Sequence, residues 1–262
     1  MGLIQENHRY SYSQLQSVSE CPYGFYLQKI EKADGLVQNA FASQGTLIHD
    51  ILDEWAKGIL TIDQMPQEYE RRYPLEVTQS WPRVLAVKGY AQKAFDLGYA
   101  YLKNFDGFPG YRIVDAEQKF ETDIFGRPFV GIIDMLLEDE ETGDLIVLDH
   151  KSKSLTAFKK AEDEMYKQQY LYAKHVFEKY DKWPKRLMFN LFKEGGLKRE
   201  RPFKQDEYEE TLKWALAQIE KIEQFDMIDW LNMKQPADFF CQELCSCRAI
   251  CPNGKPQFKK KR

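Results

Sequence analysis

Two β-rich runs joined by an acidic turn constrain the fold of this chain most strongly. The runs span residues 128–138 and 144–152, and the turn contains Thr142-Gly143-Asp144. Two such runs separated by a Gly-containing turn are typical of a β-hairpin. Each run is apolar except where a carboxylate interrupts it, at Asp134 in the first run and at Asp149 in the second.

The residues that follow Asp149 define a candidate site at the end of the second run. Side chains alternate across a strand, so Asp149 and Lys151 project to one face and His150 to the other. Two carboxylates can hold a hard divalent ion, and a lysine beside them would lie where negative charge develops on a phosphate. A strand-end salt bridge between Lys151 and either Asp134 or Asp149 accounts for the same residues equally well.

Two helical segments favour the site over the salt bridge. The segment 165–176 has helical apolar spacing and carries Gln168 and Tyr172 four residues apart, on one face. The segment 45–55 is a second amphipathic helix, with His49 near its start. A lone His or a Gln/Tyr pair is common on ordinary helices. The complete order of His, Asp, Asp-x-Lys and Gln-x-x-x-Tyr is much rarer by chance.

This order of motifs resembles the RecB-like branch of the PD-(D/E)XK nuclease superfamily, which includes the exonucleases of CRISPR adaptation and many phage exonucleases. The resemblance runs from about Tyr10 to Pro252. It implies an α/β fold with a restriction-endonuclease-like core, in which helices flank a central mixed β-sheet. It also implies a helical N-terminal part that covers the substrate channel and a cysteine-ligated C-terminal segment.

The resemblance also implies roles for individual residues. It makes Lys151 the catalytic cation, and it makes Gln168 and Tyr172 contacts to the nucleic acid or supports of the metal site. The implied ligands of Mg²⁺ or Mn²⁺ are His49, Asp134 and Asp149. Many relatives carry Glu where this chain has Asp149, whose shorter side chain changes the expected metal distances. Glu117, in the strand-like run 115–122, is either a support of the site or an exposed strand acid, and the second interpretation is favoured.

The cysteines form a second group of candidate ligands. One lies early and four lie within eleven residues near the end: Cys21, Cys241, Cys245, Cys247 and Cys251. Residues 1–10 are polar and charged and do not form a hydrophobic leader, which favours the reducing cytoplasm over a secreted disulfide framework. Clustered thiolates in that compartment most often bind metal. Without a Cys-x-x-Cys pair, ordinary zinc knuckles fit poorly, and five free thiols remain an alternative.

Iron–sulfur members of the same family show one early and three late cysteines, with a final Cys-x5-Cys step like that from Cys245 to Cys251. The resemblance therefore assigns a 4Fe–4S cluster to Cys21, Cys241, Cys245 and Cys251. Cys247 is then the spare thiol, although it could exchange roles with Cys245, and zinc is the alternative metal. By closing most of the chain into a loop, such a cluster would stabilise the fold by roughly 4–5 kcal/mol, a structural role.

Composition is compatible with a folded nuclease. The chain has 262 residues, of which 43% are hydrophobic and 14% aromatic, enough for a substantial core. The net charge of −4 does not itself indicate nucleic-acid binding, but a phosphate footprint is local. Basic residues gather at 151–153, 159–160, 185–186 and in a tail at 255–262. No apolar run is long enough to span a membrane.

The pattern predicts one nuclease domain over residues 1–254 followed by a basic tail at 255–262. Its parts are a mainly helical region at 1–110 carrying Cys21 and His49, a catalytic α/β core at 111–205, and a helix with the cysteine cluster at 206–254. Predicted helices span 11–29 with a break at Cys21-Pro22, 41–58, 67–72, 82–106, 161–180 and 206–229. Predicted strands span 112–122, 128–138, 144–152, 186–192 and 198–203.

Together these features predict a metal-dependent DNA nuclease. We expect an exonuclease that acts from DNA ends, with single-stranded DNA favoured, in recombination, repair or phage DNA metabolism. A helicase or recombination protein is an expected partner, and no membrane is involved. The alternative is a catalytically silent, iron–sulfur-stabilised nucleic-acid-binding module of the same fold.

Overall fold

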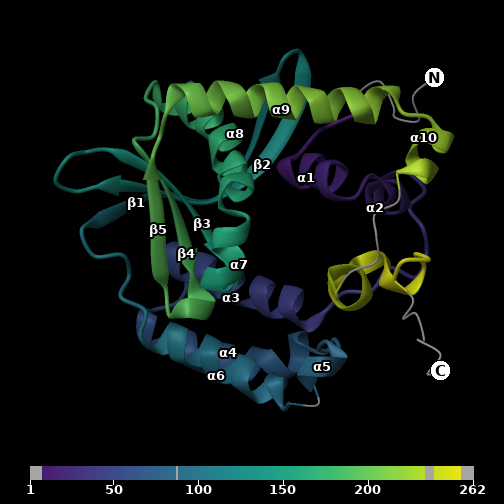
Figure 1. Ribbon diagram of the computed structural model, residues 1–262. Coiled ribbons are helices and arrows are strands. Elements are labelled where there is room, and N and C mark those ends of the chain that lie inside the picture. Colours follow the sequence, from purple (N-terminus) through teal and green to yellow (C-terminus); the bar gives the residue numbers. More distant parts are fainter. Residues whose placement is uncertain (1–7, 87, 234–238, 255–262) are drawn as a thin grey trace.

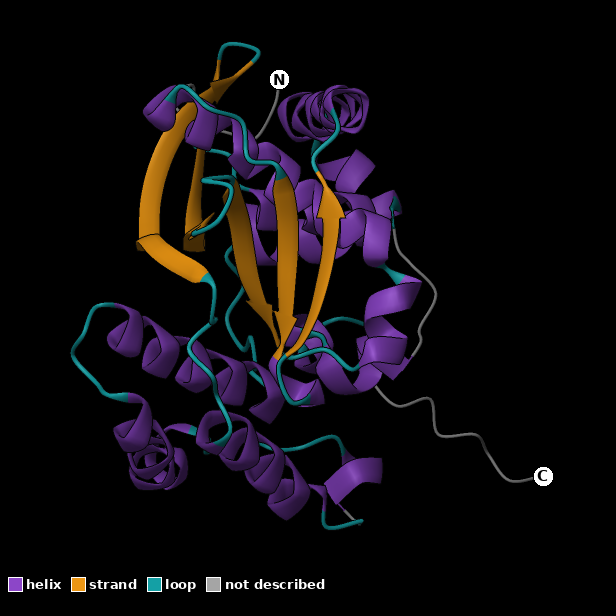
Figure 2. Cartoon of the chain, turned by 90° about the vertical axis from the view of Figure 1, so that its left-hand side faces the viewer, coloured by secondary structure: helices purple, strands orange, loops and turns teal. Residues whose placement is uncertain are grey.

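A five-stranded mixed sheet forms the centre of the computed structural model, which describes residues 8–86, 88–233 and 239–254 (Figures 1 and 2). The strands lie in chain order: β1 (Tyr111–Ile124), β2 (Arg127–Asp139), β3 (Leu145–Lys151), β4 (Arg186–Leu191) and β5 (Leu197–Pro202). Neighbouring strands are antiparallel except β3 and β4, which are parallel. The mixed sheet matches the predicted architecture.

Helices cover both faces of the sheet, and the sheet separates the hydrophobic core into two parts (Figure 1). One face packs against α1 (Tyr12–Glu20), α8 (Glu162–Tyr180) and α9 (Gln205–Gln224), and the other against α3 (Ala40–Ala56), α4 (Met65–Glu76) and α6 (Tyr90–Lys103). Strand β3 is buried on both sides, with Val147 in the first core and Leu148 in the second. This explains why the run is almost continuously apolar.

The two hairpins are set by residues with positive φ. Phe125 and Gly126 have φ values of 52° and 79° and join β1 to β2 as a two-residue turn, the geometry that suits strand twist. Gly143, with φ 69°, lies in the turn between β2 and β3, where its N–H donates to the Asp139 carbonyl oxygen. The hairpin predicted from the acidic turn is therefore confirmed.

The parallel pairing of β3 with β4 requires a crossover, which α7 (Leu155–Lys160) and α8 supply. The sequence pattern did not predict α7, because its six residues are too few for a periodic signal. Ser154 begins the helix by accepting a hydrogen bond from Ala157 N at 3.3 Å.

Two predicted long helices are wrong, because each is interrupted. The expected helix 82–106 is α5 (Arg83–Ala86) followed by α6, which begins after Gly89 at φ 65°. The expected helix 206–229 ends at Gln224, and α10 (Met227–Asn232) starts anew. Asp226 caps α10 by accepting hydrogen bonds from Ile228 N and Asp229 N. A left-handed glycine at the first point and a side-chain cap at the second override the helical periodicity.

The predicted helix 67–72 is also longer than expected. Helix α4 begins at Met65, after the 3₁₀ turn Ile62–Gln64, and runs to Glu76. Pro66 occupies the first turn, where its missing N–H costs nothing. Pro74 lies close to the C-terminal end, so the helix ends soon after it.

The early and late cysteine segments lie side by side. After α1, the chain breaks at Cys21 and continues as α2 (Pro22–Phe25) and a π-helical turn, Tyr26–Ile30. The late segment contains a second π-helical turn, Phe240–Leu244, and a 3₁₀ turn, Ser246–Ala249. Backbone and side-chain hydrogen bonds, such as Val37 N to Ser246 O at 2.9 Å, hold it against the chain that precedes α3.

Within the described ranges, none of the helices combines the length and apolar character that a membrane crossing requires. The basic tail predicted at 255–262 lies outside the described residues.

Candidate active site

One cavity of about 670 Å³ brings all the residues predicted for the catalytic site together. Its walls come from α1, α3, β1, β2, β3 and α8, and Lys119 is the residue that β1 contributes. The predicted residues on these walls are His49, Asp134, Asp149, Lys151, Gln168 and Tyr172.

The end of β3 orients three of its residues in the way that strand alternation predicts. Asp149 and Lys151 face the cavity, whereas His150 is buried on the opposite side, with its Nδ1 2.9 Å from Asn190 Nδ2. The backbone N–H of His150 donates to Asp134 Oδ2 at 2.8 Å. Strand β3 therefore also fixes the Asp134 carboxylate of the neighbouring strand.

Lys151, Asp149 and Gln168 form a hydrogen-bonded network on the cavity wall. Lys151 Nζ lies 2.7 Å from Asp149 Oδ2 and donates to Gln168 Oε1 at 3.0 Å. Gln168 Nε2 donates to Asp149 Oδ1 at 2.8 Å and to the Tyr172 hydroxyl at 3.2 Å. The salt bridge expected as an alternative is thus present, but it lies within the cavity and is one part of a larger constellation.

Asp134 lies in an environment that disfavours its charge. Burial, assisted by the negative charge of Asp149, raises the pKa of Asp134 to about 8. The Lys151 ammonium and the His150 N–H oppose this rise in pKa but do not cancel it. The site therefore contains more negative charge than its own donors neutralise.

His49 reaches the cavity from α3. Its Nδ1 lies 3.4 Å from Asp134 Oδ2, and its ring packs edge-on against His150 and Phe192. Burial lowers the pKa of His49, although the charge of Asp149 opposes that effect. A lowered pKa keeps the imidazole neutral, which is the form that binds a metal ion.

Close packing beside β2 fixes Tyr172. Its ring lies edge-on against Phe120, and both rings cover Gly131. A Cβ at Gly131 would lie 2.5 Å from Phe120 Cζ and 2.8 Å from Tyr172 Cε1, so only glycine fits. The burial of Tyr172 raises the pKa of its phenol, which therefore stays protonated.

Glu117 is the residue whose predicted environment is wrong. The favoured interpretation as an exposed strand acid fails, because Glu117 is half-buried and faces the site. One ligand atom from each of His49, Glu117 and Asp134 lies within 4.8 Å of the others. Counting residues outward from the Phe125-Gly126 turn places Glu117 opposite Asp134. This count could have predicted that Glu117 lies at the site, whereas the polarity pattern of the strand could not.

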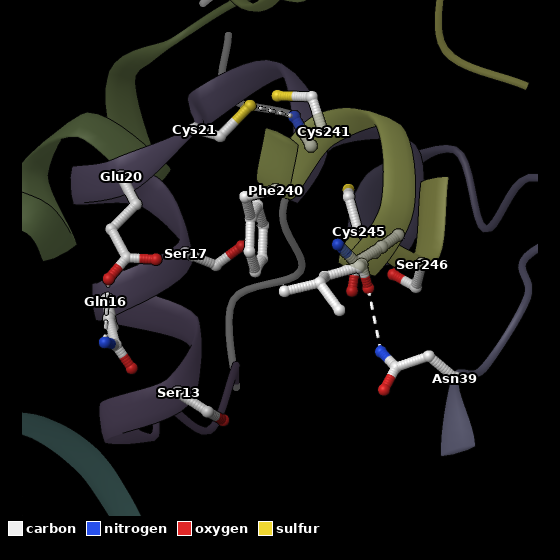
Figure 3. Close-up of a pocket in the computed structure, with 13 residues that line it drawn as sticks. Ser13, Gln16, Ser17, Glu20, Cys21, Asn39, Phe240, Cys241, Cys245 and Ser246 are labelled. Carbon is white, nitrogen blue, oxygen red and sulfur yellow. Dashed lines mark hydrogen bonds between the residues drawn. The ribbon is translucent and has the colours of Figure 1, made fainter. Parts of the chain in front are cut away.

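A second cavity, of about 730 Å³, lies where the cysteine segments meet (Figure 3). Three of the predicted cluster ligands line it: Cys21 between α1 and α2, Cys241 in the late π-helical turn, and Cys245 after that turn. Phe240 and Asn39 lie on its walls, and Asn39 Nδ2 donates to the Leu244 carbonyl oxygen at 2.9 Å. Residues more than two hundred positions apart thus share one cavity.

The other two cysteines, Cys247 and Cys251, lie close to this cavity but are not among the residues that line it. Cys247 is buried, with its Sγ 3.8 Å from the Gly24 carbonyl oxygen, and a hydrogen bond with Cys245 lowers the pKa of Cys247 to about 7. Cys251 N donates to Cys247 O at 2.8 Å. Burial raises the pKa of Tyr23, and the nearby Cys251 and Cys247 raise it further. All five thiols therefore surround the start of α2.

Comparison with known proteins identifies the family of this chain. Residues 9–252 match the sequence model of the PD-(D/E)XK nuclease superfamily. No curated protein matches the chain significantly. A solved structure from Eubacterium rectale, provisionally named an exonuclease, is similar over 95% of this chain and 87% of its own, with 12% identity and a TM-score of 0.47. Because the match to the family covers nearly its whole length, this chain belongs to the PD-(D/E)XK nuclease superfamily.

Proposed function

We propose that this chain is a divalent-metal-dependent DNA nuclease of the RecB-like branch, which hydrolyses phosphodiester bonds from DNA ends. The observation that carries the proposal is the single cavity shared by an imidazole, two carboxylates, a lysine and a Gln/Tyr pair. A salt bridge alone would need only Lys151 and Asp149. The convergence of four elements on the same cavity favours a catalytic constellation.

The donor set suits Mg²⁺ or Mn²⁺ held by His49, Asp134 and Asp149. The negative charge of Asp149 helps to raise the pKa of the buried Asp134, and a bound cation would offset this repulsion. Carboxylate oxygens suit both ions, and the imidazole shifts the balance toward Mn²⁺. Such an ion, when bound, lowers the pKa of an attacking water and stabilises charge on the phosphate.

The chain's own residues supply the remaining chemistry. Lys151 carries a positive charge on the cavity wall, and its contacts with Asp149 and Gln168 fix that charge before substrate arrives. A preorganised cation of this kind stabilises negative charge as it develops on a phosphate. Gln168 and Tyr172 position this cation and offer polar groups to the nucleic acid.

The alternative is a nucleic-acid-binding module of the same fold without catalytic activity. Loss of activity in such a fold follows from loss of the acids or of the lysine. Because Asp134, Asp149 and Lys151 are all present and face one cavity, the enzyme is favoured.

Cleavage of end-labelled DNA tests the catalytic proposal. With Mg²⁺ or Mn²⁺ we expect the wild-type protein to degrade the DNA, and Asp149→Ala or Lys151→Ala to lower the rate by at least about 100-fold. Lys93→Ala, which removes an exposed lysine of α6 that does not line the cavity, is the matched control and should cut like wild type. A wild type that cuts no nucleic acid, or Asp149 and Lys151 variants that cut normally, would refute the assignment.

The mode of attack is tested with matched linear and circular DNA. An exonuclease releases label from linear single strands and leaves closed circles intact. Comparing 5′-labelled with 3′-labelled substrates gives the polarity. Nicking of circular DNA at a rate similar to that on linear DNA would show that the enzyme is an endonuclease.

We further propose that Cys21, Cys241, Cys245 and Cys251 hold a structural 4Fe–4S cluster. The shared cavity at the start of α2 is large enough for such a group, and three of the four thiols line it. The pKa of Cys247 is lowered, so this thiol is the substitute for Cys245 as a ligand. Zinc remains the alternative metal. The cluster would connect the two ends of the chain and stabilise them as a unit.

Anaerobic purification tests the cluster. We expect brown protein with visible charge-transfer absorption and about four iron and four sulfide per chain, the content of a 4Fe–4S cluster. Cys21→Ser should lose the colour and unfold at lower temperature, whereas Cys247→Ser should keep both properties. Colourless wild-type protein that contains only zinc would refute the iron–sulfur assignment.

We propose that residues 1–254 act as one nuclease domain, with the helical region at 1–110 covering the substrate. Helix α1 supports this proposal, since Ser13 and Gln16 lie on the walls of both cavities. DNA is the proposed substrate in recombination, repair or phage DNA metabolism. A helicase or recombination protein is the proposed partner.

A further inference from the structure

Glu117 is a carboxylate beside the proposed metal site that the motif order does not include. It lies on β1 between Ala116 and Gln118, which pair with Met135 and Ile133 of β2, so its place in the ladder is opposite Asp134. Opposed residues of antiparallel strands are close neighbours. Asp134 in turn lies one position beyond the last pair of β2 with β3, next to Asp149. Three adjacent strands thus each contribute one carboxylate to the same region.

Within residues 8–86, 88–233 and 239–254, the Glu117 carboxylate has no direct partner, although the charges of His49 and Lys57 attract it. Its ligand atom lies within 4.8 Å of those of His49 and Asp134, and the side chain is half-buried. Among the described residues, none forms a hydrogen bond or an ion pair with the Glu117 carboxylate. Asp149 differs, because Lys151 contacts one of its oxygens and Gln168 the other.

The geometry of the group suits one cation. Mg²⁺, Mn²⁺ and Ca²⁺ bind oxygen ligands at about 2.0–2.6 Å, so two ligands on opposite sides of one ion lie about 4–5 Å apart. The ligand atoms of His49, Glu117 and Asp134 lie within 4.8 Å of one another, so no pair is farther apart than two ligands of one ion can be. The donors come from α3, β1 and β2, three elements of the packed fold, and small side-chain rotations would bring them to bonding distance.

We propose that Glu117 is a further ligand of the divalent cation, and that the ion lies on the β1 side of Asp134, between Glu117 and His49. This inference rests on the proposed function as a metal-dependent nuclease and extends its metal site by one carboxylate. In this arrangement Asp149 keeps its contacts with Lys151 and Gln168. Adding the Glu117 carboxylate to the imidazole and the two aspartate carboxylates gives the site more negative charge, which strengthens binding of a divalent ion.

The backbone conformation of Glu117 indicates that its side chain has a function at this position. Its φ is 49°, in the left-handed region that glycine adopts easily and that glutamate rarely adopts. A glycine would satisfy this conformation better than a glutamate. The presence of a carboxylate at this position is therefore explained by what the carboxylate binds, not by the backbone.

Titration of Mn²⁺ into the metal-free full-length protein, followed by electron paramagnetic resonance of free Mn²⁺, tests the inference without using activity. We expect Glu117→Gln to weaken Mn²⁺ binding at least tenfold. Glu121→Gln, the same change on an exposed carboxylate of β1, should bind Mn²⁺ like wild type. Glu117→Gly also removes the carboxylate but relaxes the backbone, so it should bind as weakly as Glu117→Gln while melting no lower than wild type without metal.

The outcomes separate this inference from the proposed function. If wild type binds Mn²⁺ and both Glu117 variants bind it equally well, Glu117 is not a ligand, and the nuclease proposal stands on its other residues. If His49→Ala and Asp134→Asn lose binding while Glu117→Gln does not, the ion lies away from β1. If wild type binds no Mn²⁺, the inference and the metal dependence of the proposed function fail together.

Discussion

At the scale of single residues, Gln168 connects the groups of the candidate site. Its amide presents both a donor and an acceptor, and the site uses both: Oε1 accepts from Lys151, and Nε2 donates to Asp149 and Tyr172. Neither a carboxylate nor an apolar side chain could make all three contacts. Gln168 is therefore a positioning residue for the lysine and the second aspartate.

Gln168→Glu tests this role with almost no change in size. The new carboxylate still accepts from Lys151 but cannot donate to Asp149, and it adds a like charge beside that residue. We expect kcat to fall by about 10–100-fold with KM within about threefold of wild type, as for supports that orient a metal ligand. Steady-state kinetics on labelled DNA give both constants.

Gln67→Glu is the matched control, because Gln67 is exposed on α4. It should leave both constants unchanged. An equal loss of kcat in the two variants would indicate a nonspecific effect of added charge. A rise in KM alone for Gln168→Glu would instead assign the residue to DNA binding.

At the scale of elements, two helical glycines have opposite surroundings. Gly98 of α6 packs against α4 and α3. An added Cβ would lie 2.7 Å from Cζ of Tyr69, on α4, and 3.2 Å from Nε2 of Gln44, on α3. Gly45 of α3 faces Ser152, where an added Cβ would lie at ordinary contact distances of 3.5 Å and 3.7 Å. The close approach of α4 to α6 therefore depends on Gly98, whereas α3 does not depend on Gly45.

Gly98→Ala should lower the free energy of unfolding by about 1–3 kcal/mol, because Tyr69 and Gln44 are buried, hydrogen-bonded to one another and unable to move freely. Gly45→Ala should raise that free energy by up to about 1 kcal/mol, the gain in helix propensity. Chemical denaturation of both variants measures the difference. Equal effects would show that helix propensity, not packing between α4 and α6, governs these positions.

At the scale of the whole molecule, one ion pair connects segments that are distant in the chain. Arg127, at the tip of the β1–β2 hairpin, donates two hydrogen bonds to Glu223 of α9, at 3.1 Å and 2.9 Å. Tyr10 donates a third to Glu223 at 3.2 Å and pairs through its backbone with β2. The N-terminal segment, the hairpin and α9 are thereby held together.

This ion pair predicts a dependence of stability on pH. The hydrogen bonds from Arg127 lower the pKa of Glu223 below its ordinary value of 4.5. The stabilisation is therefore fully present above about pH 4.5 and is lost as the pH falls through the lower native value. Both side chains are about one-third exposed, so we expect about 0.5–1 kcal/mol.

Glu223→Gln should lower the free energy of unfolding by that amount at pH 7, and the difference from wild type should shrink as the pH falls below 4.5 and through the lowered native pKa of Glu223. Glu209→Gln, on the exposed face of the same helix, is the control. Urea denaturation at several pH values makes the comparison. A difference that persists unchanged at pH 3 would rule out the charge as its cause.

Much of the fold and of the candidate site could be predicted from local patterns. Two apolar runs and the Gly143 turn predict the β2–β3 hairpin, and strand alternation places Asp149 and Lys151 together on one face. The order of the motifs then predicted which residues share the cavity. The hairpin and the shared face of Asp149 and Lys151 depend on neighbours within one or two elements, and the spacing of residues in the sequence reflects such neighbours directly.

Helix ends and the environment of Glu117 could not be predicted in the same way. The break at Gly89 and the cap at Asp226 arise from single residues within otherwise periodic runs. Glu117 has the ordinary pattern of an exposed strand acid. Only its position opposite Asp134, and the packing of α3 against that end of the sheet, bring it within reach of His49.

The order of the motifs, through its resemblance to the nuclease family, predicted the type of fold, and strand alternation, turns and helical spacing predicted individual elements because these are local properties. Tertiary structure alone decided which charges share a buried space. It placed Glu117 beside Asp134 and His49, and it brought Cys21 to a cavity shared with Cys241 and Cys245. The physical reason is that burial, electrostatic repulsion and ligand geometry depend on distances through space, which the order of residues does not fix.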